Sequence, residues 1–391
     1  MTTAEVWNER VRRQGEHVFY SWSAQAKAKP LCVEKAEGVW LTLAGGHLLL
    51  DFQSQSFNAN LGYAHQGVKA AMHRILDEGY AFYPQVVHEE KAKLGENLAR
   101  LTPGGPTGGL QKAFLASSGA EATENAIKIA RLFTGKHKVV TRYRSYHGAS
   151  LAAGAFGGDY RRIAVDAGVT GVLRLPDPYP RGSGQHIDTL CLLEEMIEIE
   201  GAETIACVLF EGVTGANGVF VQDKTYWQRL ADICRRNGIL LVVDEVLSGF
   251  GRTGKWFAMD HVGVVPDMMT LGKGITGGYA PLSAVMVSQA IARHFDANVL
   301  WCGLTNYGHP LCCAAANAAI AAYETEGLID NAHARGLELA TFLDRLAVDH
   351  PMIAEVRHIG LLAAIDLQKS SDDKSTWVPY RAKGDDAAKV A

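Results

Sequence analysis

The sequence has few of the patterns that mark a secreted, membrane-bound or metal-dependent protein. Its seven cysteines are an odd number and form no CxxC pair, which indicates reduced thiols rather than a disulfide framework. The 14 histidines include no HExxH, so we expect no metal site. The chain also has no basic segment leading into an apolar one and no run of 18 apolar residues. We therefore expect neither an export signal nor a membrane span, and a cytoplasmic location.

An excess of basic charge is absent as well. The net charge of −4 and the isoelectric point near 6.4 give no general attraction to nucleic acid or to an anionic membrane. Apolar residues make up 48% of the chain and charged residues 20%, as in ordinary globular proteins. At 391 residues the chain is longer than one ordinary domain and can bury a large core.

Helical spacing alternates with short apolar runs from about residue 66 onward. The pattern predicts helices at 66–78, 89–101, 119–133 and 223–237, and strands at 111–116, 137–141, 204–210, 238–243, 266–271 and 282–287. Such alternation predicts an α/β protein with a mostly parallel sheet covered by helices on both faces. A hairpin at 38–52 precedes this region. Later patterns predict a smaller layer with helices at 309–326 and 330–348 and strands at 353–359 and 361–367.

Lys273 and Asp244 are the residues on which the functional interpretation depends. Asp244 ends the apolar run 239–243, and Lys273 stands after another apolar stretch, inside a glycine-rich loop. Side chains at successive strand ends can converge on one small molecule. Pyridoxal phosphate needs such a pair, because an amine holds its aldehyde and a carboxylate keeps its ring nitrogen protonated.

Both residues also have simpler interpretations. Most lysines are solvated, and Asp244 could form a structural ion pair with Arg252, because a buried carboxylate needs a cation or donors. The immediate neighbours of Lys273 are uncharged, however. That setting favours a desolvated amine of lowered pKa, which suits imine chemistry.

The segment Ser117-Ser118-Gly119-Ala120-Glu121-Ala122 joins a predicted strand to a predicted helix. Alone, it is most simply a capping box, in which Ser118 binds the first-turn N–H groups and Glu121 reaches back. The same helix start could bind a phosphate, because its free N–H groups and its dipole attract an anion. The two interpretations are compatible.

Two other strand ends carry polar residues. Tyr146 and His147 follow the run 137–141, where an aromatic ring could stack on a flat cofactor or could simply pack. Glu211 ends the run 205–210 before a glycine-containing loop. It could cap that loop, or position polar groups of the cofactor.

With these motifs the sequence closely resembles the class III aminotransferases, which are pyridoxal-phosphate enzymes of fold type I. The resemblance runs from about residue 17 to the end, and rests on Val-Val-Asp-Glu-Val (242–246), Gly-Phe-Gly-Arg-Thr-Gly (249–254) and Leu-Gly-Lys-Gly (271–274). It implies a seven-stranded, mostly parallel sheet with helices on both faces. A small α+β domain would be formed by both termini.

The resemblance also implies roles for individual residues. Lys273 would be the catalytic lysine that binds the cofactor's aldehyde, and Asp244 would bind the ring nitrogen. The other predicted cofactor-binding residues are Ser118, Gly119, Ala120, Tyr146, His147, Glu211, Val246 and Thr305. Of these, residues 118–120 would hold the phosphate, and Tyr146 and Val246 would enclose the ring. Thr305 would reach the phosphate of a neighbouring subunit, which implies a homodimer, or a tetramer, with shared active sites.

The substrate pocket is predicted from a departure from the family pattern. Leu247 stands where members often have glutamine, and thus resembles the ω-amino acid:pyruvate branch and the taurine aminotransferases. The segment Phe-Tyr-Ser-Trp-Ser-Ala-Gln (19–25) is similar to that of taurine-type members. By position, Trp22 and Phe57 would line an apolar, aromatic pocket.

The resemblance divides the chain into three parts. Residues 1–52 would be an N-terminal segment of the small domain, 53–300 the large cofactor-binding domain and 301–391 the C-terminal small domain. Members normally continue further and carry an arginine there that binds substrate carboxylate, whereas this chain ends at Lys389-Val390-Ala391. Either the small domain is truncated or a shorter one is tolerated, and in both cases we expect substrate binding to be affected more than cofactor binding.

The predicted function is that of a pyridoxal-phosphate-dependent transaminase with ping-pong kinetics. It would move an amino group from an amine or ω-amino acid, such as taurine or β-alanine, to a keto acid. Both pyruvate and 2-oxoglutarate fit as acceptor. The alternatives are an aminomutase or racemase using the same lysine, and a cofactor-binding protein with impaired catalysis. A nicotinamide-dependent dehydrogenase is disfavoured, because the glycine-rich segment 272–278 lacks GxGxxG spacing.

Overall fold

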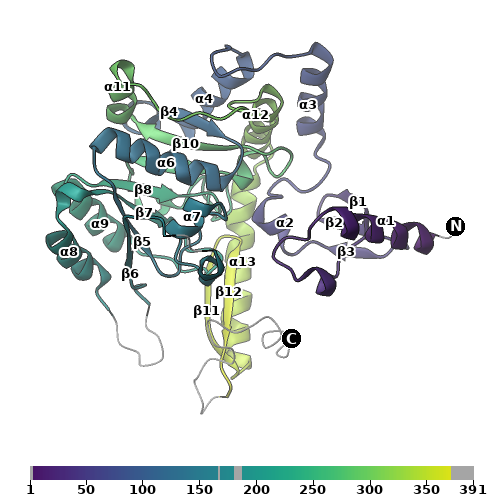
Figure 1. The fold of residues 1–391 in the computed structure, drawn as a ribbon. Helices are drawn as coiled ribbons and strands as arrows, with labels where there is room; N and C mark the ends of the chain where they lie inside the picture. Colours follow the sequence, from purple (N-terminus) through teal and green to yellow (C-terminus); the bar gives the residue numbers. More distant parts are fainter. Residues whose placement is uncertain (1–2, 166–167, 180–186, 371–391) are drawn as a thin grey trace.

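The computed structural model describes residues 3–165, 168–179 and 187–370, and its centre is a seven-stranded sheet (Figure 1). The strand order is β4-β10-β9-β8-β7-β5-β6. The strands are β4 Leu110–Ala116, β5 Lys138–Arg142, β6 Val172–Leu175, β7 Ile205–Glu211, β8 Leu240–Asp244, β9 Met268–Leu271 and β10 Ser283–Ser288. Neighbours from β9 to β6 are parallel, and β10 is antiparallel to both β9 and β4. The predicted mostly parallel sheet is confirmed.

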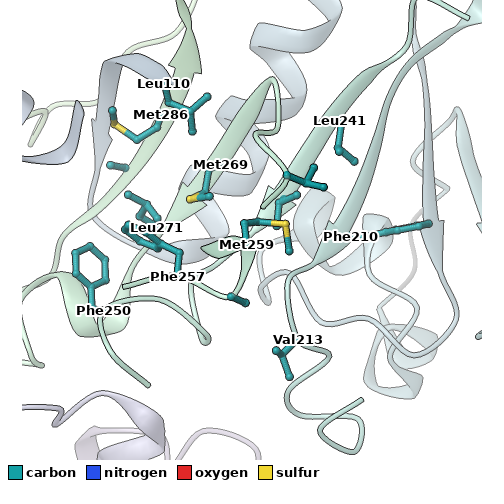
Figure 2. Close-up of a cluster of buried hydrophobic side chains, with 14 of the residues drawn as sticks. Leu110, Phe210, Val213, Leu241, Phe250, Phe257, Met259, Met269, Leu271 and Met286 are labelled. Atoms are coloured by element: carbon teal, nitrogen blue, oxygen red, sulfur yellow. The ribbon is translucent and has the colours of Figure 1, made fainter. Parts of the chain in front are cut away.

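The central strands are buried on both faces. In β8, Leu241 and Val243 belong to one hydrophobic cluster, whereas Leu240 and Val242 belong to another. Successive side chains of a strand point to opposite faces, so continuously apolar strands require a cover on each side. Figure 2 shows part of the first cluster, where Phe210 and Met269 lie with side chains from the loops beyond the strands.

Helices cover both faces of the sheet, as predicted. The first cluster includes side chains from α4, α8, α9 and α12, and the second from α6, α7 and α11. The helices between residues 54 and 300 are α2 Ser54–Phe57, α3 Gln66–Glu78, α4 Glu89–Leu101, α5 Gly105–Gly108, α6 Gly119–Thr134, α7 Leu151–Phe156, α8 Thr189–Glu200, α9 Lys224–Arg236, α10 Met259–Val262 and α11 Gln289–Ala297. Short 3-10 turns lie at η1 Gln25–Lys27, η2 Tyr160–Ala164, η3 Ala202–Thr204 and η4 Lys273–Ile275.

The N-terminal residues form an arm that extends to one side of the body (Figure 1). It contains α1 Thr3–His17 and an antiparallel sheet of β1 Val33–Glu37, β2 Trp40–Leu43 and β3 Leu48–Leu50. Strands β2 and β3 are the predicted hairpin. The α2 turn that follows is left-handed, because φ is positive at all four of its residues.

The C-terminal part contains two long helices and a hairpin. Helix α12, Pro310–Thr325, packs against α3 and α4, and its small side chains are mostly buried. Helix α13, Leu328–Asp349, packs against the hairpin of β11 Ile353–Ile359 and β12 Leu362–Leu367. The end at residues 389–391 lies outside the described residues. The division at residues 52 and 300 stays a prediction.

Predicted elements are present with their ends shifted by at most two residues, but several elements were not predicted. Strand β6 has only four residues and includes Arg174. Helix α8 begins Thr-Leu-Cys-Leu-Leu, in which consecutive apolar residues hide the helical spacing. Among the described residues no helix is long and apolar enough to cross a membrane.

Candidate active site

A cavity of about 640 Å³ lies at the carboxyl ends of β5, β7, β8 and β9. It brings together all but one of the residues predicted to bind cofactor or substrate. These are Trp22, Phe57, Ser118, Gly119, Ala120, Tyr146, His147, Glu211, Asp244, Val246 and Lys273. Thr305 does not line the cavity of its own chain: it is exposed, in the loop between α11 and α12.

Asp244 at the end of β8 is held by two donors. Its Oδ2 lies 2.7 Å from Nδ1 of His147, and its Oδ1 accepts a hydrogen bond of 2.9 Å from the backbone N–H of Val246. The alternative interpretation, an ion pair with Arg252, is wrong, because the Arg252 guanidinium instead contacts Ser54 and Asn60. These two contacts fix the orientation of a buried carboxylate.

Glu211 at the end of β7 joins two loops below the cavity. Its carboxylate accepts hydrogen bonds from the backbone N–H groups of Tyr146, at 2.9 Å, and Gly215, at 2.8 Å. It therefore caps the loop after β7 and also fixes the backbone that carries the Tyr146 ring. Burial raises the pKa of Glu211 to about 7, although these bonds and His147 oppose the shift.

Lys273 enters the cavity from the turn after β9. Its backbone has φ of +43°, a left-handed conformation that is strained for a residue other than glycine. Burial lowers the pKa of its amine, whereas Asp244 and Glu211 raise it. The Nζ atom lies 6.0 Å from the centre of the Phe57 ring.

The start of α6 forms another part of the wall. Oγ of Ser118 accepts a hydrogen bond from the N–H of Glu121, and the Glu121 carboxylate accepts one of 2.7 Å from the N–H of Ser117. This is the predicted capping arrangement. A Cβ atom at Gly119 would lie 3.0 Å from Val246, so glycine allows the helix start to approach the loop after β8.

The cavity also contains a guanidinium that the sequence did not suggest. Arg161 lies 4.3 Å from the centre of the Tyr146 ring and 5.0 Å from that of Trp22. It is paired with Asp159 through two side-chain hydrogen bonds of 2.7 and 3.1 Å. Phe57 and Leu247 contribute apolar surface to the same wall. No spacing pattern marked Arg161, which lies in the short turn η2.

The groups in this cavity fit pyridoxal phosphate. It offers an amine, a carboxylate, the start of a helix and an aromatic ring, which suit an aldehyde, a ring nitrogen, a phosphate and a flat ring. Two buried polar atoms that line it, Oδ1 of Asn58 and Nε2 of His147, have no partner among the described residues, so they suit a polar ligand. The described residues contain no cluster of three metal-ligating side chains.

Comparison with known proteins finds similar aminotransferases. The profile described as aminotransferase class-III matches residues 22–385. The taurine–pyruvate aminotransferase of Bilophila wadsworthia is 30% identical, with 95% of this chain and 84% of that protein covered. The putrescine–pyruvate aminotransferase of Pseudomonas aeruginosa is also 30% identical, with 90% and 79% covered. The solved taurine:2-oxoglutarate aminotransferase of Bifidobacterium kashiwanohense, in complex with pyridoxal phosphate and glutamate, has a TM-score of 0.92 and 33% identity over 98% of this chain and 87% of that one.

Proposed function

The chain belongs to the class III aminotransferases, whose cofactor is pyridoxal phosphate, and from this premise we propose that its amino donor is an ω-amino acid such as taurine or β-alanine. The acceptor is a keto acid such as pyruvate or 2-oxoglutarate, and the two half-reactions follow ping-pong kinetics. One observation supports the donor class: the cavity that holds Lys273 also holds the Arg161 guanidinium.

We assign the following roles to the residues of the cavity. Pyridoxal phosphate, when bound, supplies an aldehyde for the donor amine and a ring that withdraws electrons from the donor carbon. Nζ of Lys273 holds the aldehyde at rest and is the base that accepts the proton of the donor carbon. The Asp244 carboxylate, oriented by His147, keeps the ring nitrogen protonated.

The remaining cofactor contacts follow from their positions in the wall. The start of α6, at Ser118, Gly119 and Ala120, binds the phosphate, because backbone N–H groups and the helix dipole favour an anion there. Tyr146 and Val246 pack against the ring. Glu211 acts on the site by holding the Tyr146 backbone.

Arg161 binds the acidic group of the donor. Its bonds to Asp159 use two of five N–H donors, so donors remain for a sulfonate or carboxylate. Trp22 packs on the guanidinium, and Phe57 and Leu247 contact the aliphatic part of the donor. A donor with an amine at one end and an acid at the other matches this arrangement.

The working unit is a homodimer with shared sites. The apolar arm surface consists of exposed side chains on the N-terminal arm: Val18, Phe19, Trp22, Leu31, Val39, Trp40, Leu48, Leu49, Leu50 and Phe52. Exposed apolar patches of this kind mark interaction surfaces. In a dimer, Thr305 would face the partner's cavity and contact the phosphate there.

A donor panel tests the proposal. The full chain is assayed with taurine, β-alanine, α-alanine and an uncharged alkylamine, each against pyruvate and 2-oxoglutarate. We expect net amino transfer that prefers the ω-amino acids and is abolished by Lys273→Ala, but not by Lys128→Ala on the exposed face of α6. Best turnover with α-alanine would contradict the donor class. Isomerisation of a donor without net transfer would favour an aminomutase or racemase instead.

A further inference from the structure

The turn that carries Lys273, residues 272–280, lies directly against residues 54–65, here called the wrapping segment. Side chains of the wrapping segment approach the turn at two of its glycines. A Cβ atom at Gly274 would lie 2.6 Å from Nδ2 of Asn60, and one at Gly277 would lie 2.5 Å from Cδ1 of Leu61. Both distances are shorter than real side-chain contacts, so a larger residue at either position would require the Asn60 or the Leu61 side chain to move.

Hydrogen bonds hold the turn at both of its ends, one end to the wrapping segment and the other to α12. The hydroxyl of Tyr279 donates to the carbonyl oxygen of Gly62 at 2.8 Å and accepts from the backbone N–H of His65 at 2.5 Å. The hydroxyl of Tyr323, on the buried helix α12, donates to the carbonyl oxygen of Gly274 at 2.7 Å. The residue next to Lys273 is therefore held from a second direction.

Arg252 connects the wrapping segment to the loop that follows β8. Its Nη2 donates to Oγ of Ser54 at 3.2 Å and to Oδ1 of Asn60. Nδ2 of Asn60 in turn donates to the carbonyl oxygen of Phe250 at 3.0 Å. In the part of the chain that the structure describes, no carboxylate forms a salt bridge with this largely buried guanidinium, and its Nε has no hydrogen-bond partner.

We propose that Arg252 is a positioning residue for Lys273, which it serves by binding Ser54 and Asn60 and so fixing the wrapping segment against the lysine turn. The inference rests on the proposed role of Lys273 as the lysine that binds the cofactor. A left-handed residue other than glycine persists only where its surroundings hold it. Asn60, Gly277 and Tyr323 supply those contacts, and Arg252 holds Asn60.

The charge of Arg252 adds an electrostatic effect to this contact. Burial is the largest effect on the pKa of the Lys273 amine, and it lowers that pKa. The carboxylates of Asp244 and Glu211 raise it, and the Arg252 guanidinium lowers it. A neutral amine is the form that reacts with an aldehyde. An arginine without a carboxylate partner therefore suits this position, because a salt bridge would cancel its field.

Other ionisable groups face Lys273 from each element around it. Glu211 and Asp244 lie at the ends of β7 and β8, and Tyr146 and His147 lie on the loop after β5. Arg161, bonded to Asp159, lies in η2, Arg252 on the loop after β8, and Tyr323 on α12. Replacing Arg252 leaves the chemical identity of all the other groups unchanged. A change in the titration of Lys273 can then be assigned to Arg252.

The test uses the full chain loaded with pyridoxal phosphate, in the resting state and without substrate. The visible absorbance of the lysine-bound cofactor is titrated with pH for wild type, Arg252→Met, Arg252→Lys and Asn60→Ala, and the rate of cofactor loss into an excess of buffer is measured. Circular dichroism checks that each variant is folded.

We expect the titration midpoint of Arg252→Met to move to higher pH, and its cofactor loss to accelerate about tenfold, as for the loss of one charged hydrogen bond. Arg252→Lys should restore the midpoint, because it keeps the charge. Asn60→Ala keeps the arginine but removes its link to the wrapping segment, so it should accelerate cofactor loss. If Arg252→Met folds poorly, Asn60→Ala still decides the positioning role.

A wild-type midpoint and wild-type retention in both Arg252→Met and Asn60→Ala would overturn the inference. Lys273→Ala separates this outcome from failure of the proposed function. If the pH-dependent absorbance persists in Lys273→Ala, Lys273 does not bind the cofactor and the proposed function fails. If it disappears there but is unchanged in the Arg252 and Asn60 variants, only the inference fails.

Discussion

At Arg161 the fold places a charged group beside two aromatic rings in a partly apolar cavity. The Trp22 and Tyr146 rings restrict the guanidinium, and Asp159 fixes its plane. A fixed guanidinium loses little conformational entropy when it binds an acid. It should therefore discriminate between donors rather than support all of them equally.

We expect Arg161→Met to lower kcat/KM for taurine and β-alanine by about 10- to 100-fold, the range for losing a charge-assisted hydrogen bond. An uncharged alkylamine of similar length should lose much less, because its end has no charge for Arg161 to bind. Steady-state kinetics with both donors on wild type and variant measure the ratio. An equal loss for the two donors would show that Arg161 acts only on the structure of the cavity.

Glu245 gives a prediction about stability. It is fully buried, and its carboxylate accepts hydrogen bonds from Ser248 and from the backbone N–H groups of Ala258, at 3.0 Å, and Met259, at 2.9 Å. Burial raises its pKa from 4.5 to about 7. Its stabilising contribution is then fully present below the unfolded pKa and is lost as the pH rises through 7.

Replacing Glu245 by Gln should therefore change the pH dependence of stability. Between pH 6 and pH 8 wild type should lose about 1 kcal/mol relative to Glu245→Gln, as linkage requires for one such group. Urea unfolding followed by tryptophan fluorescence at the two pH values measures the difference. Because both proteins have the same histidines, the histidine contribution to the pH dependence cancels in the difference between them. If the difference in free energy of unfolding between the two proteins were the same at pH 6 and pH 8, Glu245 would be ionised throughout this range.

At the scale of elements, the left-handed α2 turn is the least expected part of the fold. Ser54, Gln55, Ser56 and Phe57 all have φ between 51° and 64°. Each such residue costs about 1–2 kcal/mol relative to the right-handed form. The carboxylate of Asp51 supports the turn by accepting a hydrogen bond of 2.8 Å from the N–H of Gln55.

Substitutions at Gln55 test this strain, because its side chain is exposed. Gln55→Gly should stabilise the protein by up to about 1 kcal/mol, since glycine adopts positive φ without penalty. Gln55→Val should destabilise it, because a β-branched residue tolerates positive φ poorly. Thermal unfolding of the two variants should show changes in Tm of opposite sign relative to wild type. A change of the same sign in both would mean that the turn is not left-handed in solution.

The sequence predicted those site residues that follow buried strands. Asp244 was found because an uninterrupted apolar run identifies a central strand and its end. Lys273 was found from its glycine-rich loop and uncharged neighbours, and Ser118 because a helix start has its own residue pattern. The pairing of His147 with Asp244 depends on the distance between two loops, which no local pattern contains. Arg161 lies in an irregular turn, and the left-handed α2 turn contains no glycine that would have indicated it.

At the scale of the whole molecule, the apolar arm surface is the feature on which the proposed dimer rests. Phe19 and Phe52 are 89% and 90% exposed on it, and Trp301, near Thr305, is 71% exposed. Such side chains stabilise an interface when they become buried, at about 25 cal/mol per Å² of apolar area. The body of the chain needs no contribution from them for its own core.

We expect wild type to be a dimer in solution, and Phe19→Asp with Phe52→Asp to shift it towards monomer, because burying two unpaired carboxylates opposes association. Light scattering coupled to size exclusion measures the mass. Leu337→Asp, on the exposed side of α13, is the matched control and should leave the mass unchanged. A monomeric wild type would refute the shared-site arrangement, and with it the role of Thr305.

The hand of the α2 turn restricts how this cavity can be altered. Ser56 and Phe57 are cavity-lining residues in a backbone conformation that a chain of mirror-image amino acids would adopt readily. A replacement at either position must first tolerate positive φ, and only then does its fit to a substrate matter. A mutagenesis library aimed at new donors would thus lose most β-branched replacements at positions 56 and 57. Leu247, which lines the same cavity outside that turn, offers a position free of this restriction.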